Sequence, residues 1–238
     1  MNEKTHVSVC CYQGDAEQVR NLWSLYQQHT GSVTVFSPGN SAVNLGLPGE
    51  VDVWKGRVGY IGQDSLDRQR EHLQHLLTTD AEWFFLNDSD SFCLSPRFDQ
   101  RLYLDRDTLW ANLVQEPRPH PSLYPKIASQ PPYFFSRQAC EAMRRVPAGK
   151  TIAHPVTPYI DWLMTALASE AKLKLRSFTD LETPCPESNR GQVFADPWDQ
   201  LAYRIRHMNC RFMHPIKTTE QIRICQWAYA YREPNQYE

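Results

Sequence analysis

The chain has 238 residues and a formal net charge of −2, and 41% of its residues are hydrophobic, including 7 Trp, 11 Tyr and 10 Phe. This composition can build a substantial core, which excludes a disordered chain, and the near-zero charge gives no global sign of a polyanion partner. The length allows one or two domains, and we expect a single domain over residues 1–238.

The sequence shows no secretory signal and no membrane span. The N-terminus, "MNEKTHVSVCCYQGD", lacks a cleavage-site pattern, and no run approaches the roughly 18 apolar residues that a spanning helix requires. The seven cysteines are an odd number without a CxxC pair. We therefore expect a cytoplasmic protein with reduced core thiols, no structural zinc and no membrane partner.

The chain opens with a β-α-β pattern. Residues 6–12, "HVSVCCY", predict a buried strand, and 33–38, "VTVFSP", predict a second one. Between them, Asp15 and Gln18 have the spacing of a capping box at the start of a helix. The apolar residues of that helix follow helical spacing at Val19, Leu22, Trp23 and Tyr26. This order favours a parallel sheet with crossover helices.

Three further elements follow in the first half. Residues 51–54 predict a strand, 64–77 an amphipathic helix and 82–86, "EWFFL", a central strand. His72 and His75 belong to the polar face of the helix, and we interpret both as solvent-exposed.

The second half begins with a proline-rich segment. Residues 116–132 hold six prolines, which predicts a long loop rather than a helix or a central strand. Such a loop is typical of a lid or a binding segment. The elements expected after it are a helix capped by Ser136, a helix over 157–168 with Thr157 as cap and Pro158 at its first position, an edge strand over 172–178, and helices over 196–208 and 219–231. The whole pattern predicts an α/β fold with a mostly parallel central sheet flanked by helices.

The strand at 82–86 runs into the polar sequence "NDSD". In extended backbone the side chains of Asp88 and Asp90 point the same way, beyond the strand end where open α/β sheets bind ligands. Two hard oxygen donors there suit Mg²⁺ or Mn²⁺, with positions left for phosphate oxygens. A polar turn without a metal is the alternative.

Four segments in their order along the chain resemble the GT-A glycosyltransferases. They are "VSVCCY", "WFFLNDSDSF", "PPYFFSRQACEAM" and "CRFMHPIKT", and together they span nearly the whole chain. The resemblance implies a single GT-A-like, Rossmann-like domain. Residues 1–115 would form the donor-nucleotide and metal half, and 116–238 the acceptor half with the C-terminal helices.

The resemblance implies an inverting, metal-dependent transfer of a sugar from a nucleoside diphosphate sugar to a hydroxyl. UDP-sugar is the first choice of donor and Mn²⁺ or Mg²⁺ the cofactor. The metal ligands would be Asp88, Asp90 and His214, and Lys217 would contact the diphosphate. Asp161, near a helix N-terminus, would be the general base that takes the proton of the acceptor hydroxyl.

The donor pocket would hold three further residues besides Asp88. Tyr12 and Gln13 would stack on and hydrogen-bond the base, and Arg68 would touch phosphate. Core packing for Tyr12 and a solvated helix face for Arg68 are the alternatives, and a surface position before a proline is the alternative for His214.

The acceptor is unknown from the sequence. Basic and aromatic residues interleave near the C-terminus, which would suit a hydroxymethylated base in DNA, reached by base flipping. The residues concerned are Tyr203, Arg204, Arg206, His207, Arg211, Arg223, Trp227, Tyr229, Tyr231 and Arg232. A helix core with a solvated arginine face is the alternative.

Two other functional classes remain. A nucleotidyltransferase also pairs a nucleotide with a carboxylate-held metal, although "CYQGDAEQ" has one glycine where a glycine-rich loop is usual. A non-catalytic nucleotide-sugar-binding module would keep Asp88 and Asp90 and would not need Asp161. A P-loop kinase and a classical dehydrogenase are disfavoured, because neither of their glycine motifs is present.

Overall fold

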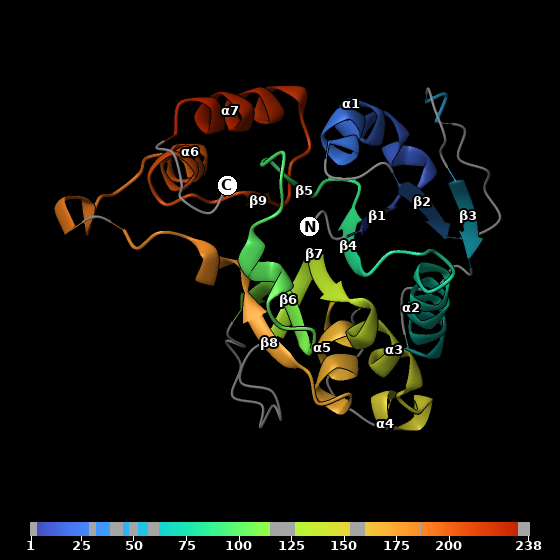
Figure 1. Cartoon of the computed structure of the whole chain (residues 1–238). Coiled ribbons are helices and arrows are strands. Elements are labelled where there is room, and N and C mark those ends of the chain that lie inside the picture. Colours follow the sequence, from blue (N-terminus) through green and yellow to red (C-terminus); the bar gives the residue numbers. More distant parts are fainter. Residues whose placement is uncertain are drawn as a thin grey trace.

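The computed structural model describes residues 4–28, 32–38, 45–47, 52–56, 62–114, 127–152, 160–185 and 187–232. Their centre is a seven-stranded sheet in the order β3-β2-β1-β4-β7-β6-β8. Four of its neighbouring pairs are parallel, while β7 runs antiparallel to both of its neighbours. The predicted α/β, Rossmann-like fold with a mostly parallel sheet is confirmed (Figure 1).

The strands of the main sheet are β1 (Thr5–Cys10), β2 (Val33–Pro38), β3 (Asp52–Gly56), β4 (Trp83–Asp88), β6 (Thr108–Val114), β7 (Ile127–Ser136) and β8 (Lys174–Ser177). A second sheet pairs β5 (Phe92–Cys93) with β9 (Phe212–Met213). The helices are α1 (Ala16–Gln27), α2 (Gly62–Leu76), α3 (Arg137–Arg145), α4 (Ala148–Ile152), α5 (Ile160–Glu170), α6 (Pro197–His207) and α7 (Thr219–Ala230). Short 3-10 turns are η1 (Gln13–Asp15), η2 (Gln100–Tyr103), η3 (Phe178–Leu181) and η4 (Glu187–Asn189).

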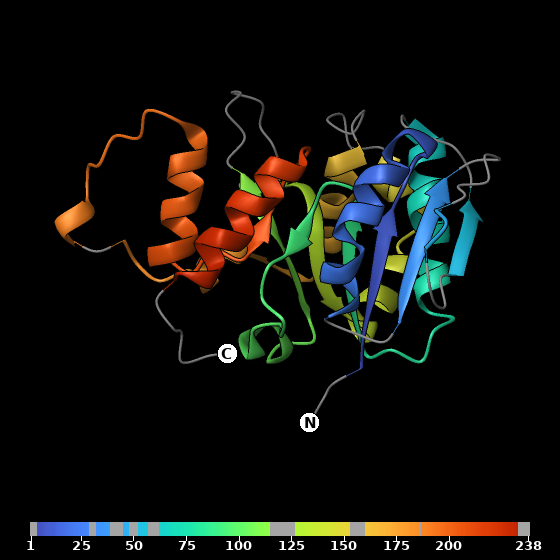
Figure 2. The same ribbon diagram turned by 90° about the horizontal axis from the view of Figure 1, so that it is seen from above.

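Helices cover both faces of the main sheet. One core joins the sheet to α1, α6 and α7, and the other joins it to α2, α3 and α5, so that α1 and α2 lie on opposite sides of the strands (Figure 2). The alternation along β4 shows this directly. Trp83 and Phe85 belong to the first core, and Phe84 and Leu86 belong to the second. A strand buried on both faces is mostly apolar, and β4 reaches a half-buried carboxylate only at its last residue, Asp88.

Several expected elements are confirmed. The two C-terminal helices lie close to their expected bounds, β8 is an edge strand, and β4 is central. The hydroxyl of Ser136 caps α3 by accepting a hydrogen bond from Ala139 N at 3.0 Å. Gly31, Thr157 and Pro158 lie outside the described residues, as do residues 115–126 of the proline-rich segment.

The prediction that no central strand falls within 116–132 is wrong for its last part. Residues 127–132 belong to β7, an interior strand. Its pairing with β4 covers only 133–136, and its pairing with β6 changes register at that point. Pro131 and Pro132 therefore fall beside an irregularity and beyond the end of the pairing with β4, where a missing N–H is tolerated.

The polar face of α2 is not fully solvated, so the interpretation of His72 as exposed is wrong. His72 is buried, its ring stacks on Phe36 at 3.9 Å, and its Nε2 lies 2.7 Å from the hydroxyl of Ser8. Arg68, one turn earlier, is also buried. Polar residues on β1 give this helix face partners inside the protein, which periodicity alone does not reveal.

The cysteines named in apolar patterns are buried as expected. Cys10, Cys11, Cys140 and Cys225 are all buried free thiols. Burial raises the pKa of the Cys11 thiol, and that of Cys225, to about 12, so both remain protonated and unreactive. Among the helices that the structure describes, none is long and apolar enough to cross a membrane.

The buried His72 predicts a loss of stability in mild acid. Burial, assisted by the charges of His75, Arg68 and His6, lowers the pKa of His72 well below 6.5. Below about pH 6.5 the His72 imidazole is therefore protonated in the unfolded chain but stays neutral in the native protein. As the pH falls further, the free energy of unfolding decreases by up to about 1.4 kcal/mol per pH unit. Urea denaturation of the wild type and His72→Phe from about pH 7.5 to about pH 5 measures this slope. The variant should show a shallower slope, and equal slopes would contradict the assignment.

Candidate metal centre

A tight turn after β4 holds the two carboxylates of the NDSD sequence. Cys10 of β1 pairs in register with Asp88, which places Asp88 at the carboxyl end of the sheet. Ser91 closes the turn, because its Oγ accepts a hydrogen bond from Asp88 N at 2.9 Å and its N–H donates to Asp88 O at 3.1 Å. The side chains of Asp88 and Asp90 are half-buried on this turn.

Helix α1 supports the turn through Tyr26. The hydroxyl of this buried side chain lies 3.3 Å from Ser89 O and 3.2 Å from Ser91 O and donates to them. Burial, followed by the nearby charge of Asp90, raises the pKa of Tyr26 well above 10, which keeps the hydroxyl protonated as a donor. The turn is thus attached to a helix as well as to a strand.

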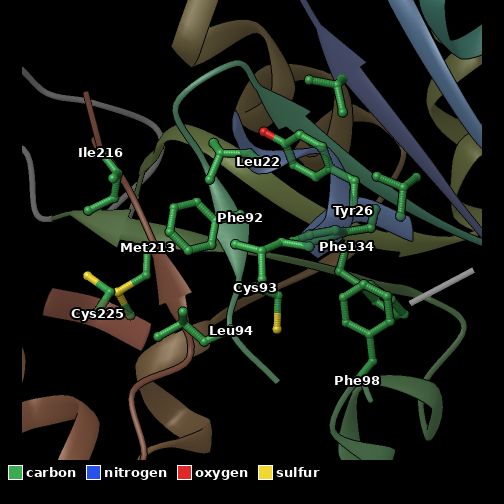
Figure 3. Packing of buried hydrophobic residues seen from close by; sticks show 14 of the residues in the cluster. Leu22, Tyr26, Phe92, Cys93, Leu94, Phe98, Phe134, Met213, Ile216 and Cys225 are labelled. Atoms are coloured by element: carbon green, nitrogen blue, oxygen red, sulfur yellow. The ribbon is translucent and has the colours of Figure 1, made fainter. Parts of the chain in front are cut away.

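The second sheet brings the late chain to the same turn. Phe92 of β5 pairs with Met213 of β9, and Ile216 N donates to Asp90 O at 2.9 Å. The side chains of Leu22, Phe92, Met213 and Ile216 gather in one apolar cluster beneath this junction (Figure 3). His214 stands between the two backbone attachments and is therefore held beside Asp90.

Gln18 adds a third attachment in place of the expected capping box. Asp15 makes no side-chain hydrogen bond at the start of α1, so that expectation is wrong. Gln18 Nε2 instead donates to Ile216 O at 2.6 Å. A side chain that appeared to serve its own helix thus ties the first helix to the last segment of the site.

The structure brings Asp88, Asp90 and His214 together. One ligand atom from each lies within 4.8 Å of the others, and His214 Nε2 is 3.3 Å from Asp90 Oδ1. Neighbouring ligands of an octahedral ion with bonds near 2.1 Å lie roughly 3 Å apart. The spacing and the set of two carboxylates with one imidazole therefore fit Mn²⁺ or Mg²⁺. Their role as metal ligands stays a prediction.

The Asp90 carboxylate is favoured in its charged form. Burial alone would raise its pKa, but the hydrogen bond with His214 and the charges of His214 and Lys217 outweigh burial and hold the pKa below 3.8. Asp90 is therefore ionised at neutral pH, as a ligand must be.

A cleft of about 500 Å³ opens beside Asp90. Lys217 is exposed at its edge, and its other charged lining residues are Asp15 and Glu17. Three acids with one lysine make this cleft net negative. It suits a cation, and it accepts an anionic group only after a cation has bound.

Tyr12 and Arg68 lie on the α2 side of the same sheet end. Arg68 Nη1 donates to the hydroxyl of Tyr12 at 2.6 Å. The pKa of the Cys10 thiol is raised to about 12, first by burial and then by the charge of Asp88, against the opposing charge of Arg68. Because Arg68 is buried, the alternative of a solvated Arg68 is excluded.

Two predicted site residues can be placed only by their backbone. Gln13 lies in η1 directly after Tyr12, and Asp161 is the second residue of α5. The side chains of both are outside the described part of the structure. Their contacts therefore stay predictions.

The topology puts the start of α5 at the sheet edge that carries Asp88. Because β7 runs antiparallel to β4, its first residues lie near the carboxyl end of β4, and Ala128 N there donates to Thr165 Oγ1 of α5 at 2.8 Å. The other end of α5 leads into β8, which starts beside Thr108 at the opposite edge. Asp161 therefore belongs to the edge that holds the metal centre.

The comparison with known proteins gives only distant likenesses, all of them to solved structures. No family model matches the chain, and no curated protein matches its sequence. Among solved structures, a crystal structure of 4-diphosphocytidyl-2C-methyl-D-erythritol synthase matches with 12% identity and a TM-score of 0.46, over 85% of this chain and 99% of that one. A structural likeness at this level carries no argument about function.

The cluster predicts one Mn²⁺ site that depends on Asp90. In an Mn²⁺ titration monitored by electron paramagnetic resonance, Asp90→Asn should weaken Mn²⁺ binding by at least about 10-fold, because a charged ligand is lost. Glu187→Gln removes an exposed acid of η4, outside the cluster, and is the matched control. Equal losses in both variants, or tight binding by Asp90→Asn, would disprove the site.

Proposed function

We propose that this protein is a metal-dependent glycosyltransferase that moves a sugar from a nucleoside diphosphate sugar to a hydroxyl group. The observation that carries the proposal is the convergence of Asp88, Asp90 and His214 at the carboxyl end of the sheet. Two carboxylates and an imidazole at that place can hold a divalent ion with positions left for diphosphate oxygens. Two of the four segments that resemble GT-A enzymes, "WFFLNDSDSF" and "CRFMHPIKT", contain these three residues.

The protein side chains around this centre suit a leaving diphosphate. A divalent ion bound there would neutralise the charge that develops on the diphosphate. Lys217 lies on the cleft beside Asp90 and adds a mobile positive charge for a phosphate oxygen. Asp15 and Glu17 on the same cleft repel an unneutralised diphosphate, so donor binding should require the metal.

Tyr12 and Arg68 are assigned to the donor nucleotide. Arg68 is held in place by burial and by its bond to the Tyr12 hydroxyl, so both side chains are oriented before a ligand arrives. Gln13, next in the chain, would contact the base. UDP-sugar remains the first choice of donor.

The transfer step assigns Asp161 as general base. The acceptor oxygen forms a bond to the anomeric carbon while the bond from that carbon to the diphosphate oxygen breaks, and the electron pair leaves with the diphosphate. The hydroxyl proton passes to the carboxylate of Asp161. The position of α5 at the edge of the metal centre supports this role.

The DNA acceptor receives limited support. Trp227 and Tyr231 are exposed on α7, and the guanidinium of Arg206 lies 5.4 Å from the Trp227 ring. Arg204 and Arg211, however, are paired with acids inside the protein and are not free for phosphates. We therefore include modified DNA among the acceptors to be tested, but we do not propose it as the acceptor.

A panel of donors tests the proposal. In a thermal-shift assay with Mn²⁺, one nucleoside diphosphate sugar, with UDP-sugars first, should raise the melting temperature, and the shift should disappear without metal or in Asp88→Asn. Slow hydrolysis of that donor should release nucleoside diphosphate. Release of pyrophosphate from a nucleoside triphosphate and a sugar phosphate would instead establish a nucleotidyltransferase. A shift that is independent of metal would contradict the proposal.

Asp161→Asn separates an enzyme from a binding module. The variant keeps the size of the side chain, so donor-induced thermal shift should survive. Loss of the base should lower the transfer rate by roughly 10² to 10⁴. A full rate in Asp161→Asn would remove this residue from the mechanism, and binding without turnover in the wild type would leave the non-catalytic module.

A further inference from the structure

A second cavity, of about 510 Å³, is lined in part by His214. Its walls come from α6, η3, the end of β6 and the segment 209–216. His214 to Ile216 line the cavity, whereas Lys217 to Thr219 line the cleft. One short segment thus borders both spaces, and His214 lies where the cavity meets the metal centre.

The cavity wall contains two buried donors that are not hydrogen-bonded within the described residues. Arg211 donates a hydrogen bond from Nε to Asn209 Oδ1 at 3.2 Å and another from Nη2 to Asp99 Oδ2 at 3.3 Å. Arg211 Nη1 and Asn209 Nδ2 have no hydrogen-bond partner among the described residues. Both residues are more than nine-tenths buried and line the cavity. A buried donor without a partner carries a desolvation penalty that an oxygen-rich ligand would relieve, following a small movement of the wall.

Both acids of the described cavity wall are held by arginines. The acids are Asp99 and Glu182, and the lining arginines are Arg211 and Arg204. Arg211 lies 3.3 Å from Asp99, and Arg204 Nε lies 3.3 Å from Glu182 Oε2, while Asp99 also accepts hydrogen bonds from Arg101 at 2.9 and 2.7 Å. A ligand therefore meets no unpaired carboxylate in the described lining, and the unpartnered donors of Arg211 and Asn209 suit hydroxyl oxygens.

The remaining lining combines aromatic faces with amides. Trp198 and the stacked pair Phe178 and Phe212, with ring centres 3.9 Å apart, supply apolar surface. Asn112 and Gln200 supply groups that both donate and accept hydrogen bonds. A sugar ring has apolar C–H faces and an edge of hydroxyls that also donate and accept, and it matches this combination.

We propose that this cavity is the acceptor site and that its ligand is a saccharide. The inference rests on the proposed function, which supplies the donor at the metal centre that includes His214. A saccharide hydroxyl at the His214 end of the cavity would be the group that bonds to the anomeric carbon, losing its proton to Asp161 as the diphosphate leaves.

Binding can be tested without catalysis. Saturation-transfer NMR with the methyl glycosides of glucose, galactose, mannose and N-acetylglucosamine should detect at least one ligand. Trp198→Ala should weaken it by at least about 10-fold, because the aromatic face is lost. Gln200→Ala, an exposed position that does not disturb the core, should weaken it about 3-fold, as expected for one neutral hydrogen bond. Trp227→Ala, an exposed tryptophan outside the cavity, is the matched control and should bind normally.

Turnover distinguishes failure of this inference from failure of the proposed function. With donor and Mn²⁺, Trp198→Ala should raise the KM for the bound glycoside, whereas Trp227→Ala should keep the KM and the rate of donor hydrolysis of the wild type. Donor hydrolysis with transfer only to an oligodeoxynucleotide containing hydroxymethylcytosine would overturn the saccharide acceptor and keep the glycosyltransferase. Glycoside binding without any donor hydrolysis would keep the cavity as a saccharide site but remove its role as acceptor site. No binding of any methyl glycoside, or equal binding by Trp198→Ala, overturns the inference.

Discussion

The site depends on a single junction between distant parts of the chain. The two-residue strands β5 and β9 pair directly after the NDSD turn, and Ile216 N bonds Asp90 O. Neither strand could be stable alone, because each is far shorter than an independent hairpin requires. Burial of Phe92, Met213 and Ile216 against α1 and the main sheet supplies the stability that the backbone pairing lacks. The position of His214 is therefore a consequence of core packing.

Two kinds of feature could be predicted from the sequence, namely the helix with regularly spaced apolar residues and the place where a buried strand ends. The position of Asp88 at the end of a strand buried on both faces was predictable. The extended backbone expected through Asp90 is wrong, because Ser89 and Asp90 form a turn, and this turn brings the two carboxylates together. The proximity of His214 came from the resemblance, because no local pattern links a residue so late in the chain to β4. Helix α1 was expected from its apolar spacing, and its stripe is buried as expected.

The unpredicted parts depend on partners that are remote in sequence. Gln18 has the spacing of a capping residue, and only the fold reveals Ile216 O as its partner. His72 has helical polar spacing, but the hydroxyl of Ser8 on a buried strand makes its burial tolerable. Tyr26 was assigned to the core correctly, while its bonds to the turn depend on where that turn closes. In each case a polar atom finds a partner across elements, which a single sequence does not encode locally.

Two spaces with different electrostatics meet at the segment from His214 to Thr219. Among the described lining residues, the cleft has three acids and one lysine, whereas both acids of the cavity are held by arginines. Basic residues near the C-terminus are therefore a poor guide to the partner, since Arg204 and Arg211 each contact an acid within the protein.

The late position of His214 has a consequence for synthesis on the ribosome. All strands of the main sheet have been made once Ser177 has left the tunnel, yet the metal centre lacks its imidazole and its Ile216 attachment until the segment after α6 emerges. A nascent chain can therefore form the scaffold while it has only the two carboxylates. The group of two carboxylates and an imidazole is complete only after His214 has been made.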